Sequence, residues 1–144
     1  MGQAREVMDK LTDAIFRQDF DAARALYAPD AVAITPDKGE VSGSGDIVEW
    51  AREMIEAFPD ARFESLSKFE SGDTAIDEGY FIGTNTGPLV MPTGETMPAT
   101  GKSARFRACD IATVENGAVS SHRFYFDQMD FAEQLGLMEQ PVAS

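Results

Sequence analysis

The stretch Ser121-His122-Arg123-Phe124-Tyr125-Phe126-Asp127 decides the fold. Aromatic and other strand-favouring residues alternate along it, so it predicts a β-strand that ends at an acid. The turn Glu115-Asn116-Gly117 stands just before it, and Asn-Gly is the strongest hairpin signal in the chain. We therefore expect a strand over 102–114 that returns antiparallel over 118–127.

Two more strands precede this hairpin. Apolar and polar residues alternate over 61–70, and Ser71-Gly72-Asp73 is typical of a turn into a second strand over 74–86. The segment 87–101 holds three prolines and three glycines, so it predicts a long loop. These strands together predict an antiparallel meander.

The N-terminal part of the chain predicts helices. Apolar residues recur at helical spacing over 3–18, over 20–27 and from Ser44 to Phe58, with a short strand over 31–35 and a rim or lid loop over 36–45. Asp130, followed three residues later by Glu133, predicts a capped C-terminal helical turn. The predicted fold class is α+β, with a curved antiparallel sheet wrapped over N-terminal helices in a cone, as one domain over 1–144.

The amino-acid composition limits the classes of partner that the protein is expected to bind. The chain has 144 residues, 43% of them hydrophobic, and its formal net charge of −13 disfavours nucleic acid and anionic membrane surfaces. No apolar run approaches the roughly 18 residues of a membrane span, and Met1 to Lys10 lacks an apolar signal core. We expect a cytoplasmic protein whose partner is a small hydrophobic molecule or a second copy of the chain.

A single cysteine, Cys109, excludes an internal disulfide, and one cysteine with one histidine cannot form a typical structural zinc site. We therefore expect no metal and no cofactor.

Two acids are candidates for chemistry. Phe106, Ala108, Asp110 and Ala112 share one face of the 102–114 strand, and two small residues beside an acid predict a hollow there. Asp110 or Asp127, surrounded by aromatic side chains, could act as a base because burial raises a carboxyl pKa. Alternatively, Asp127 caps the following turn and Asp110 pairs with an arginine. The turn alone does not settle which face of the returning strand meets Asp110.

Other candidates also have two readings. His122 is either a proton donor or a hydrogen-bonded strand residue, and Tyr125 needs a partner for its hydroxyl if it is buried. Large aromatics on helix faces either fill the core or line a ligand site. We predict that the walls of a substrate site comprise Phe16, Tyr27, Trp50, Phe58, Phe106 and Arg123.

Several of these segments carry a family resemblance. The blocks Gly83-Thr84-Asn85-Thr86-Gly87-Pro88-Leu89 and Pro98-Ala99-Thr100-Gly101-Lys102, then Asn116-Gly117, His122, Asp127 and Gln134-Leu135-Gly136-Leu137, resemble the SnoaL-like polyketide cyclase (ester cyclase) family. That family belongs to the nuclear-transport-factor-2-like superfamily, together with ketosteroid isomerase and limonene epoxide hydrolase.

The resemblance implies a cup-shaped dimer that closes polyketide rings by aldol addition without metal or cofactor. It places the general acid/base on Asp127. In our own first interpretation, Asp110, His122 and Tyr125 orient the substrate or hydrogen-bond the enolate oxygen. Family members often have His-Trp where this chain has His122-Arg123. The first interpretation is thus an acid/base enzyme acting on a hydrophobic carbonyl compound by cyclisation or isomerisation.

Two alternatives stay open. The chain could be a non-catalytic ligand-binding or dimerisation module built on the same cup. It could also hydrolyse epoxides, because Asp110, Arg123 and Asp127 supply the aspartate, arginine and aspartate that the related enzymes use.

Overall fold

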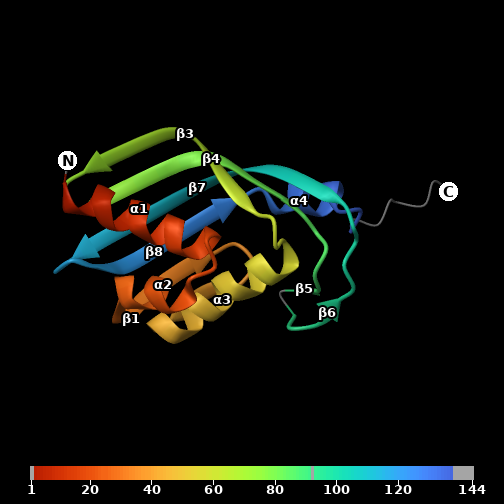
Figure 1. Ribbon diagram of the computed structural model, residues 1–144, viewed down its shortest axis with the longest axis horizontal. Coiled ribbons are helices and arrows are strands. Elements are labelled where there is room, and N and C mark those ends of the chain that lie inside the picture. The colour runs from red at the N-terminus through yellow and green to blue at the C-terminus, as the bar shows by residue number, and fades with distance from the viewer. Residues whose placement is uncertain (1, 92, 138–144) are drawn as a thin grey trace.

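The computed structural model describes residues 2–91 and 93–137, so Pro92 of the predicted 87–101 loop lies outside the described residues (Figure 1). Helices and strands alternate first and strands dominate later. In chain order the elements are α1 (Gln3–Phe16), α2 (Phe20–Leu26), β1 (Tyr27–Thr35), β2 (Gly39–Ser42), α3 (Ser44–Ala57), β3 (Arg62–Ser71), β4 (Thr74–Thr84), β5 (Leu89–Val90), β6 (Thr96–Met97), β7 (Ser103–Glu115), β8 (Ala118–Phe126) and α4 (Gln128–Gln134).

In the described residues the main sheet has six strands in the order β2-β1-β8-β7-β4-β3. Neighbouring strands are antiparallel except β1 and β8, which run parallel. The β7–β8 hairpin forms as predicted, because Asn116 and Gly117 both adopt the positive φ angles, 52° and 79°, that a tight hairpin turn requires. The prediction of a curved antiparallel sheet with N-terminal helices is confirmed.

The helices cover one face of this sheet (Figure 1). Helix α1 lies across β4 and β7 and buries an apolar stripe that includes Val7, Leu11, Ala14 and Ile15. Helix α3 packs beside β1 and β5, and α4 lies near the end of β7. Figure 1 shows α4, β5 and β6 at the same end of the sheet, away from the N-terminus.

The covered face of the sheet is the β7 face that carries Phe106, Ala108 and Ala112, all three buried. The hollow predicted beside the two alanines is wrong, because both pack into the hydrophobic core and neither lines a pocket. The register pairs Asp110 with Phe124 and Ala112 with His122, so the same face of β8 carries His122, Phe124 and Phe126. This settles the register that the turn alone left open.

Glycine lets two parts of the sheet approach closely. Strand β3 has a bulge between Ser65 and Ser67, opposite Gly79 of β4. A Cβ atom at Gly79 would lie 2.1 Å from the carbonyl oxygen of Glu64, so a larger residue there would displace the backbone.

Four details of the sequence prediction are wrong. Tyr27 begins β1 instead of ending a helix, and the loop expected over 36–45 contains β2. The loop expected over 87–101 contains the β5–β6 hairpin. The C-terminal helix is capped by Asp127 rather than by Asp130, because the Asp127 carboxylate accepts the Asp130 backbone N–H at 3.0 Å.

No helix among the described residues is long and apolar enough to cross a membrane.

Candidate functional site

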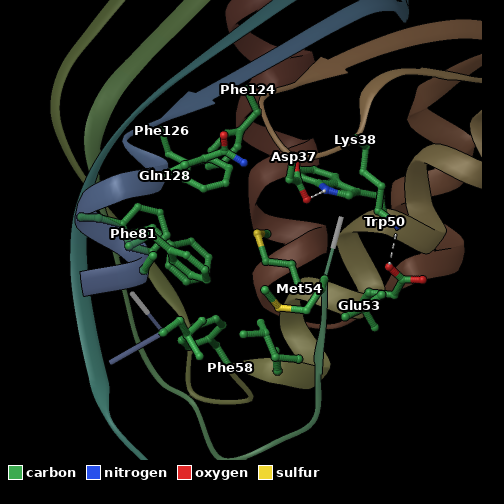
Figure 2. Close-up of a pocket in the computed structure, with 18 residues that line it drawn as sticks. Asp37, Lys38, Trp50, Glu53, Met54, Phe58, Phe81, Phe124, Phe126 and Gln128 are labelled. Carbon is green, nitrogen blue, oxygen red and sulfur yellow. Dashed lines mark hydrogen bonds and ion pairs between the residues drawn. The ribbon is translucent and has the colours of Figure 1, made fainter. Parts of the chain in front are cut away.

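A cavity of about 290 Å³ opens at the α4 end of the sheet. It is lined mainly by aromatic and aliphatic side chains from α3, β4, β5, β7, β8 and α4 (Figure 2). We call this cavity the aromatic pocket. Its lining comprises Asp37, Lys38, Trp50, Glu53, Met54, Ala57, Phe58, Phe81, Leu89, Val90, Met91, Phe106, Phe124, Phe126, Gln128, Phe131, Ala132 and Leu137.

The sheet supplies one wall of the pocket. Phe81 of β4 pairs directly with Phe106 of β7, and their rings stack with centroids 5.0 Å apart. Phe126 of β8 lies 5.4 Å from the Phe106 ring, and Phe131 of α4 meets Phe106 edge-on at 5.2 Å. Tilted and edge-on rings pack firmly, so this wall is a preformed aromatic surface.

Helix α3 and the loop after β4 supply the opposite side. Trp50, Met54 and Ala57 recur at helical spacing and line the pocket. Figure 2 shows Trp50 and Met54 on this side. The loop contributes Leu89 and Val90.

Asn85 holds the ends of this loop together. Its amide nitrogen donates to the carbonyl oxygens of Ala57 and Gly87, each at 3.0 Å. Its amide oxygen accepts from the backbone N–H and the hydroxyl of Thr100, at 2.8 and 2.9 Å. Asn85 is fully buried, so these four bonds fix the loop against α3.

Polar groups gather at one end of the pocket. The Trp50 indole N–H donates to Asp37 Oδ2 at 3.2 Å, and Lys38 Nζ lies 3.4 Å from Glu53 Oε2. Figure 2 shows Asp37 and Gln128 on the two sides of this end, with Phe58 at the other end. The pocket is therefore polar at one end and apolar at the other.

A second group of polar side chains crosses the same sheet face beneath α1. Arg5 of α1 lies 2.8 Å from Asp77 of β4, and Asp77 pairs across the strands with Asp110 of β7. His122 Nε2 contacts Asp110 Oδ1, and His122 Nδ1 lies 2.6 Å from the Tyr27 hydroxyl. We call Arg5, Asp77, Asp110, His122 and Tyr27 the polar row.

The protonation pattern of the polar row follows from burial. Burial, reinforced by the charge of Asp110, raises the pKa of the Tyr27 phenol well above its ordinary value of 10.0. Tyr27 therefore stays protonated and donates to His122 Nδ1. In the neutral imidazole only Nε2 can then carry the remaining proton, which it donates to Asp110.

Asp77 is also perturbed. Burial raises its pKa, while the charges of Arg5 and Lys68 act in the opposite direction and the charge of Asp110 adds to the rise. Two carboxyl groups thus face each other across β4 and β7, and each has a partner of its own: Arg5 for Asp77 and His122 for Asp110.

The surroundings predicted for Asp127 are wrong. Asp127 is exposed, caps α4 and does not line the aromatic pocket. A carboxylate at a helix N-terminus is held there by the first-turn N–H groups, and this draws the side chain away from the cavity. The alternative reading from the sequence, a capping acid, describes its position.

Some of the other predicted site residues line the aromatic pocket, and others lie on the outer face of the sheet. Trp50, Phe58 and Phe106 line the aromatic pocket. Tyr125 is 43% exposed and, with Arg123, lies on the outer face, so neither reaches the pocket.

Phe16 and Tyr27 belong to the interior. The Phe16 ring packs 6.5 Å from Phe63 and 6.0 Å from Phe81, and Tyr27 binds His122. Neither is among the residues that line the pocket.

The three residues considered for epoxide hydrolysis do not converge. Asp110 lies on the inner face of β7 beside His122, Arg123 lies on the outer face of β8, and Asp127 caps α4. The structure gives this set no common site.

Sequence reasoning missed Asp37, Asn85 and Arg5. The run Thr35-Pro36-Asp37-Lys38-Gly39 is a turn signal that could have placed Asp37 at the tip of a β1–β2 hairpin. Asn85 belongs to the segment from Gly83 to Leu89 that carries the family resemblance, but no sequence pattern indicates its role. Arg5 had no signal, because a charged residue on the buried side of an amphipathic helix contradicts the apolar pattern.

The fold and the end-on pocket define the class of protein. A curved sheet over N-terminal helices, with a cavity at one end, is the nuclear-transport-factor-2-like and ketosteroid-isomerase-like architecture. A model of the SnoaL-like polyketide cyclase family matches residues 5–135, so the chain belongs to that family. No curated protein matches the sequence.

Solved structures share the fold at low identity. A protein of Jannaschia sp. CCS1 assigned to the SnoaL-like polyketide cyclases superposes with a TM-score of 0.83 at 20% identity, over 95% of this chain and 94% of that one. AclR of Streptomyces galilaeus, assigned as a hydroxylase, gives 0.75 at 22% identity over 94% and 97%. An LEH-like epoxide hydrolase of M. tuberculosis gives 0.70 at 17% identity over 92% and 89%.

Proposed function

We propose that this protein is a cofactor-independent enzyme that binds a small hydrophobic carbonyl compound in the aromatic pocket and removes a proton alpha to the carbonyl with Asp110. The observation that carries the proposal is the hydrogen-bonded chain from Tyr27 through His122 to Asp110, which ends beside Phe124, a wall of the pocket. The fold has no part in this assignment, because relatives with the same fold differ in activity.

The chain of hydrogen bonds supports a base. Tyr27 fixes the His122 tautomer, and the Nε2–H bond holds one oxygen of Asp110 in place. Asp110 Oδ2 remains free of hydrogen-bond partners among the described residues. The carbon–hydrogen bond of the substrate breaks, its proton passes to Asp110, and its electron pair forms the enolate.

The enolate then has two outcomes. Return of the proton to another carbon gives isomerisation, and attack on a second carbonyl group of the same molecule gives aldol cyclisation. In both cases the proton held by Asp110 returns to the product, so no oxidant, reductant or metal enters the balance.

Phe124 links the pocket to the proposed base. It is the direct cross-strand partner of Asp110, and it lines the pocket. The Asp110 side chain keeps 15% of its surface exposed. Because Asp110 does not itself line the pocket, proton transfer requires that the Phe124 ring move aside.

Hydrogen exchange tests the chemistry without knowledge of the natural substrate. A bicyclic ketone such as 2-tetralone, incubated with the protein in deuterated water, is expected to gain deuterium alpha to the carbonyl, as followed by proton NMR. Asp110→Asn should lower the exchange rate by about 100-fold or more, because the amide cannot accept the proton.

The same assay tests the assignment that the resemblance gives. If Asp127→Asn loses exchange while Asp110→Asn keeps it, the base is Asp127 and the proposal for Asp110 fails. Thermal unfolding of both variants checks that a loss of exchange is not a loss of fold.

A second candidate function is binding without catalysis. It is favoured by one observation: none of Asp110, His122 and Asp127 lines the aromatic pocket. Trp50 is the single tryptophan and lines the pocket, so quenching of its fluorescence reports ligand binding directly. Quenching by 2-tetralone without deuterium exchange would support this candidate against the enzyme.

We also propose that two copies of the chain pair through the outer face of the sheet and act in the cytoplasm. The paired strands place Phe69, Ile76 and Ile111 in one row across that face, and Phe69 and Ile34 are exposed there. Ile111→Glu should convert a dimer to a monomer in sedimentation velocity; a wild-type monomer would contradict the pairing.

A further inference from the structure

The polar end of the aromatic pocket is built around one carboxylate. Asp37 lies at the tip of the β1–β2 hairpin, where Thr35 pairs with Gly39. The Lys38 backbone N–H donates to Thr35 Oγ1 at 3.1 Å, and Gly39 adopts a φ of 71°. This is a short, hydrogen-bonded turn that holds Asp37 against α3.

The carboxylate has few partners for a partly buried charge. Asp37 Oδ2 accepts the Trp50 indole N–H, and Oδ1 is buried without a hydrogen-bond donor among the described residues. An ionised carboxylate offers about four acceptor sites, and buried polar groups are nearly always satisfied. Asp37 therefore has acceptor capacity left at the wall of a cavity.

Neighbouring charged side chains do not use the remaining acceptor capacity of the Asp37 carboxylate. Lys38 Nζ is directed to Glu53, 3.4 Å away, and no ion pair joins it to Asp37 within the part of the chain that the structure describes. The Trp50 and Phe124 rings also line this end, and the neutral amide of Gln128 lies across the pocket from Asp37 (Figure 2). No hydrogen bond joins Gln128 to Asp37 among the described residues, so a ligand in the pocket finds one charged acceptor between mainly apolar walls.

We propose that Asp37, oriented by Trp50, is the specificity-determining residue of the pocket and selects hydrophobic ligands that carry a hydroxyl donor at the end facing the β1–β2 turn. The inference rests on the proposed function only for the pocket as the ligand site. A phenol or enol hydroxyl donates to the Asp37 carboxylate, and the apolar body lies against Phe81 and Phe106. An ether of the same shape has no donor and leaves Asp37 unsatisfied.

Calorimetric titration with a matched pair of ligands tests this selection. We expect 2-naphthol to bind at least about tenfold more tightly than 2-methoxynaphthalene, the discrimination typical of one hydrogen bond to a charged acceptor. In Asp37→Asn the amide oxygen still accepts the indole N–H, and its NH₂ group replaces an acceptor with a donor. The ratio of affinities should fall to about one.

Asp46→Asn is the matched control. Asp46 is exposed in the first turn of α3 and does not line the pocket, so this variant removes the same charge and should keep the wild-type ratio. Equal binding of the two ligands to the wild type, no binding of either, or an unchanged ratio in Asp37→Asn would overturn the proposal.

The result is separable from the test of catalysis. If Asp37 discriminates between the two ligands but 2-tetralone gains no deuterium, Asp37 remains the specificity residue and the proposed enzymatic activity fails. If 2-tetralone exchanges but the two ligands bind equally, the proposed activity stands and the role of Asp37 fails.

Discussion

The polar row and the aromatic pocket occupy the same face of the same sheet, yet their side chains differ in kind. Under α1 the face carries charges beside alanines, and at the α4 end it carries phenylalanines. The strands alternate identically in both regions, so the sheet does not impose the difference. The helix opposite imposes it: α1 brings Arg5 to the buried acids, whereas α3 brings Trp50 and Met54 to the rings.

This difference separates the two tasks of the face. Buried charges are costly unless each has its partner, so the polar row must be held in one arrangement. The pocket has hydrophobic walls and unfilled volume, so burial of these walls by a ligand contributes to binding affinity and not to the stability of the fold. Substitutions that deprive a buried charge of its partner should therefore affect folding, and substitutions in the pocket walls should affect ligand affinity.

The largest expected effect is on the Arg5–Asp77 pair. Arg5→Ala leaves the Asp77 carboxyl buried without its partner, so urea denaturation should show a loss of about 3–5 kcal/mol in the free energy of unfolding. The protein that remains folded should bind pocket ligands as before. Arg52→Ala, which removes an exposed arginine from α3, is the control and should leave the free energy of unfolding near the wild-type value. Equal losses in the two variants would contradict the distinction.

The next largest effect lies on the pocket side. Asn85→Ala removes four hydrogen bonds and leaves the carbonyl oxygen of Gly87 without its side-chain donor, while that of Ala57 keeps only the Gly87 N–H; this should cost about 2–3 kcal/mol. Because Asn85 holds the loop that carries Leu89 and Val90, ligand affinity should fall as well, as read from Trp50 quenching. Thr86→Ala, at an exposed neighbouring position, should change neither quantity. Normal affinity in Asn85→Ala would mean that the loop does not shape the pocket.

A smaller effect, with a size that depends on pH, is expected at Tyr27. Tyr27→Phe removes the bond to His122 and should cost about 1 kcal/mol near pH 7. The folded chain holds the phenol proton at a pH where the unfolded chain has lost it, because the folded pKa is raised. The wild type therefore loses stability as the pH rises past 10.0, and the variant lacks this loss.

The difference in the free energy of unfolding between wild type and Tyr27→Phe should thus be smaller at about pH 10.5 than near pH 7, as measured by urea denaturation at both pH values. A constant gap would mean that the Tyr27 phenol titrates normally and that the polar row is open to water.

The comparison also shows what the sequence could predict. Period-two alternation placed Asp110 on the inner face of β7, and Asn116-Gly117 placed the hairpin, because both are local patterns. The α3 wall at Trp50 and Phe58 followed from helical spacing. Local patterns of this kind fix elements and faces.

The partners of the buried charges could not be predicted. The pairs Arg5 with Asp77 and Tyr27 with His122 join residues 72 and 95 positions apart, and no spacing rule relates them. Tyr27 was assigned to a helix because its neighbours have helical spacing, and the parallel pairing of β1 with β8 overrides that preference. The position predicted for Asp127 is wrong for the opposite reason, because a local interaction decides it. The carboxylate caps α4 and so lies at the helix N-terminus instead of in the cavity.

Asp127 belongs to neither region, and its substitution should have the smallest effect. Asp127→Asn keeps a good N-cap, since an asparagine oxygen also accepts the Asp130 N–H, so the free energy of unfolding should change by less than about 0.5 kcal/mol. Deuterium exchange on 2-tetralone should continue at the wild-type rate, because the carboxylate is exposed and outside the pocket. Asp127→Ala separates the two properties: it should cost about 1 kcal/mol by loss of the cap and still leave exchange intact. Loss of exchange in both folded variants would mean that the acid at the end of β8 does reach the substrate, and that Asp127, not Asp110 of the polar row, is the base.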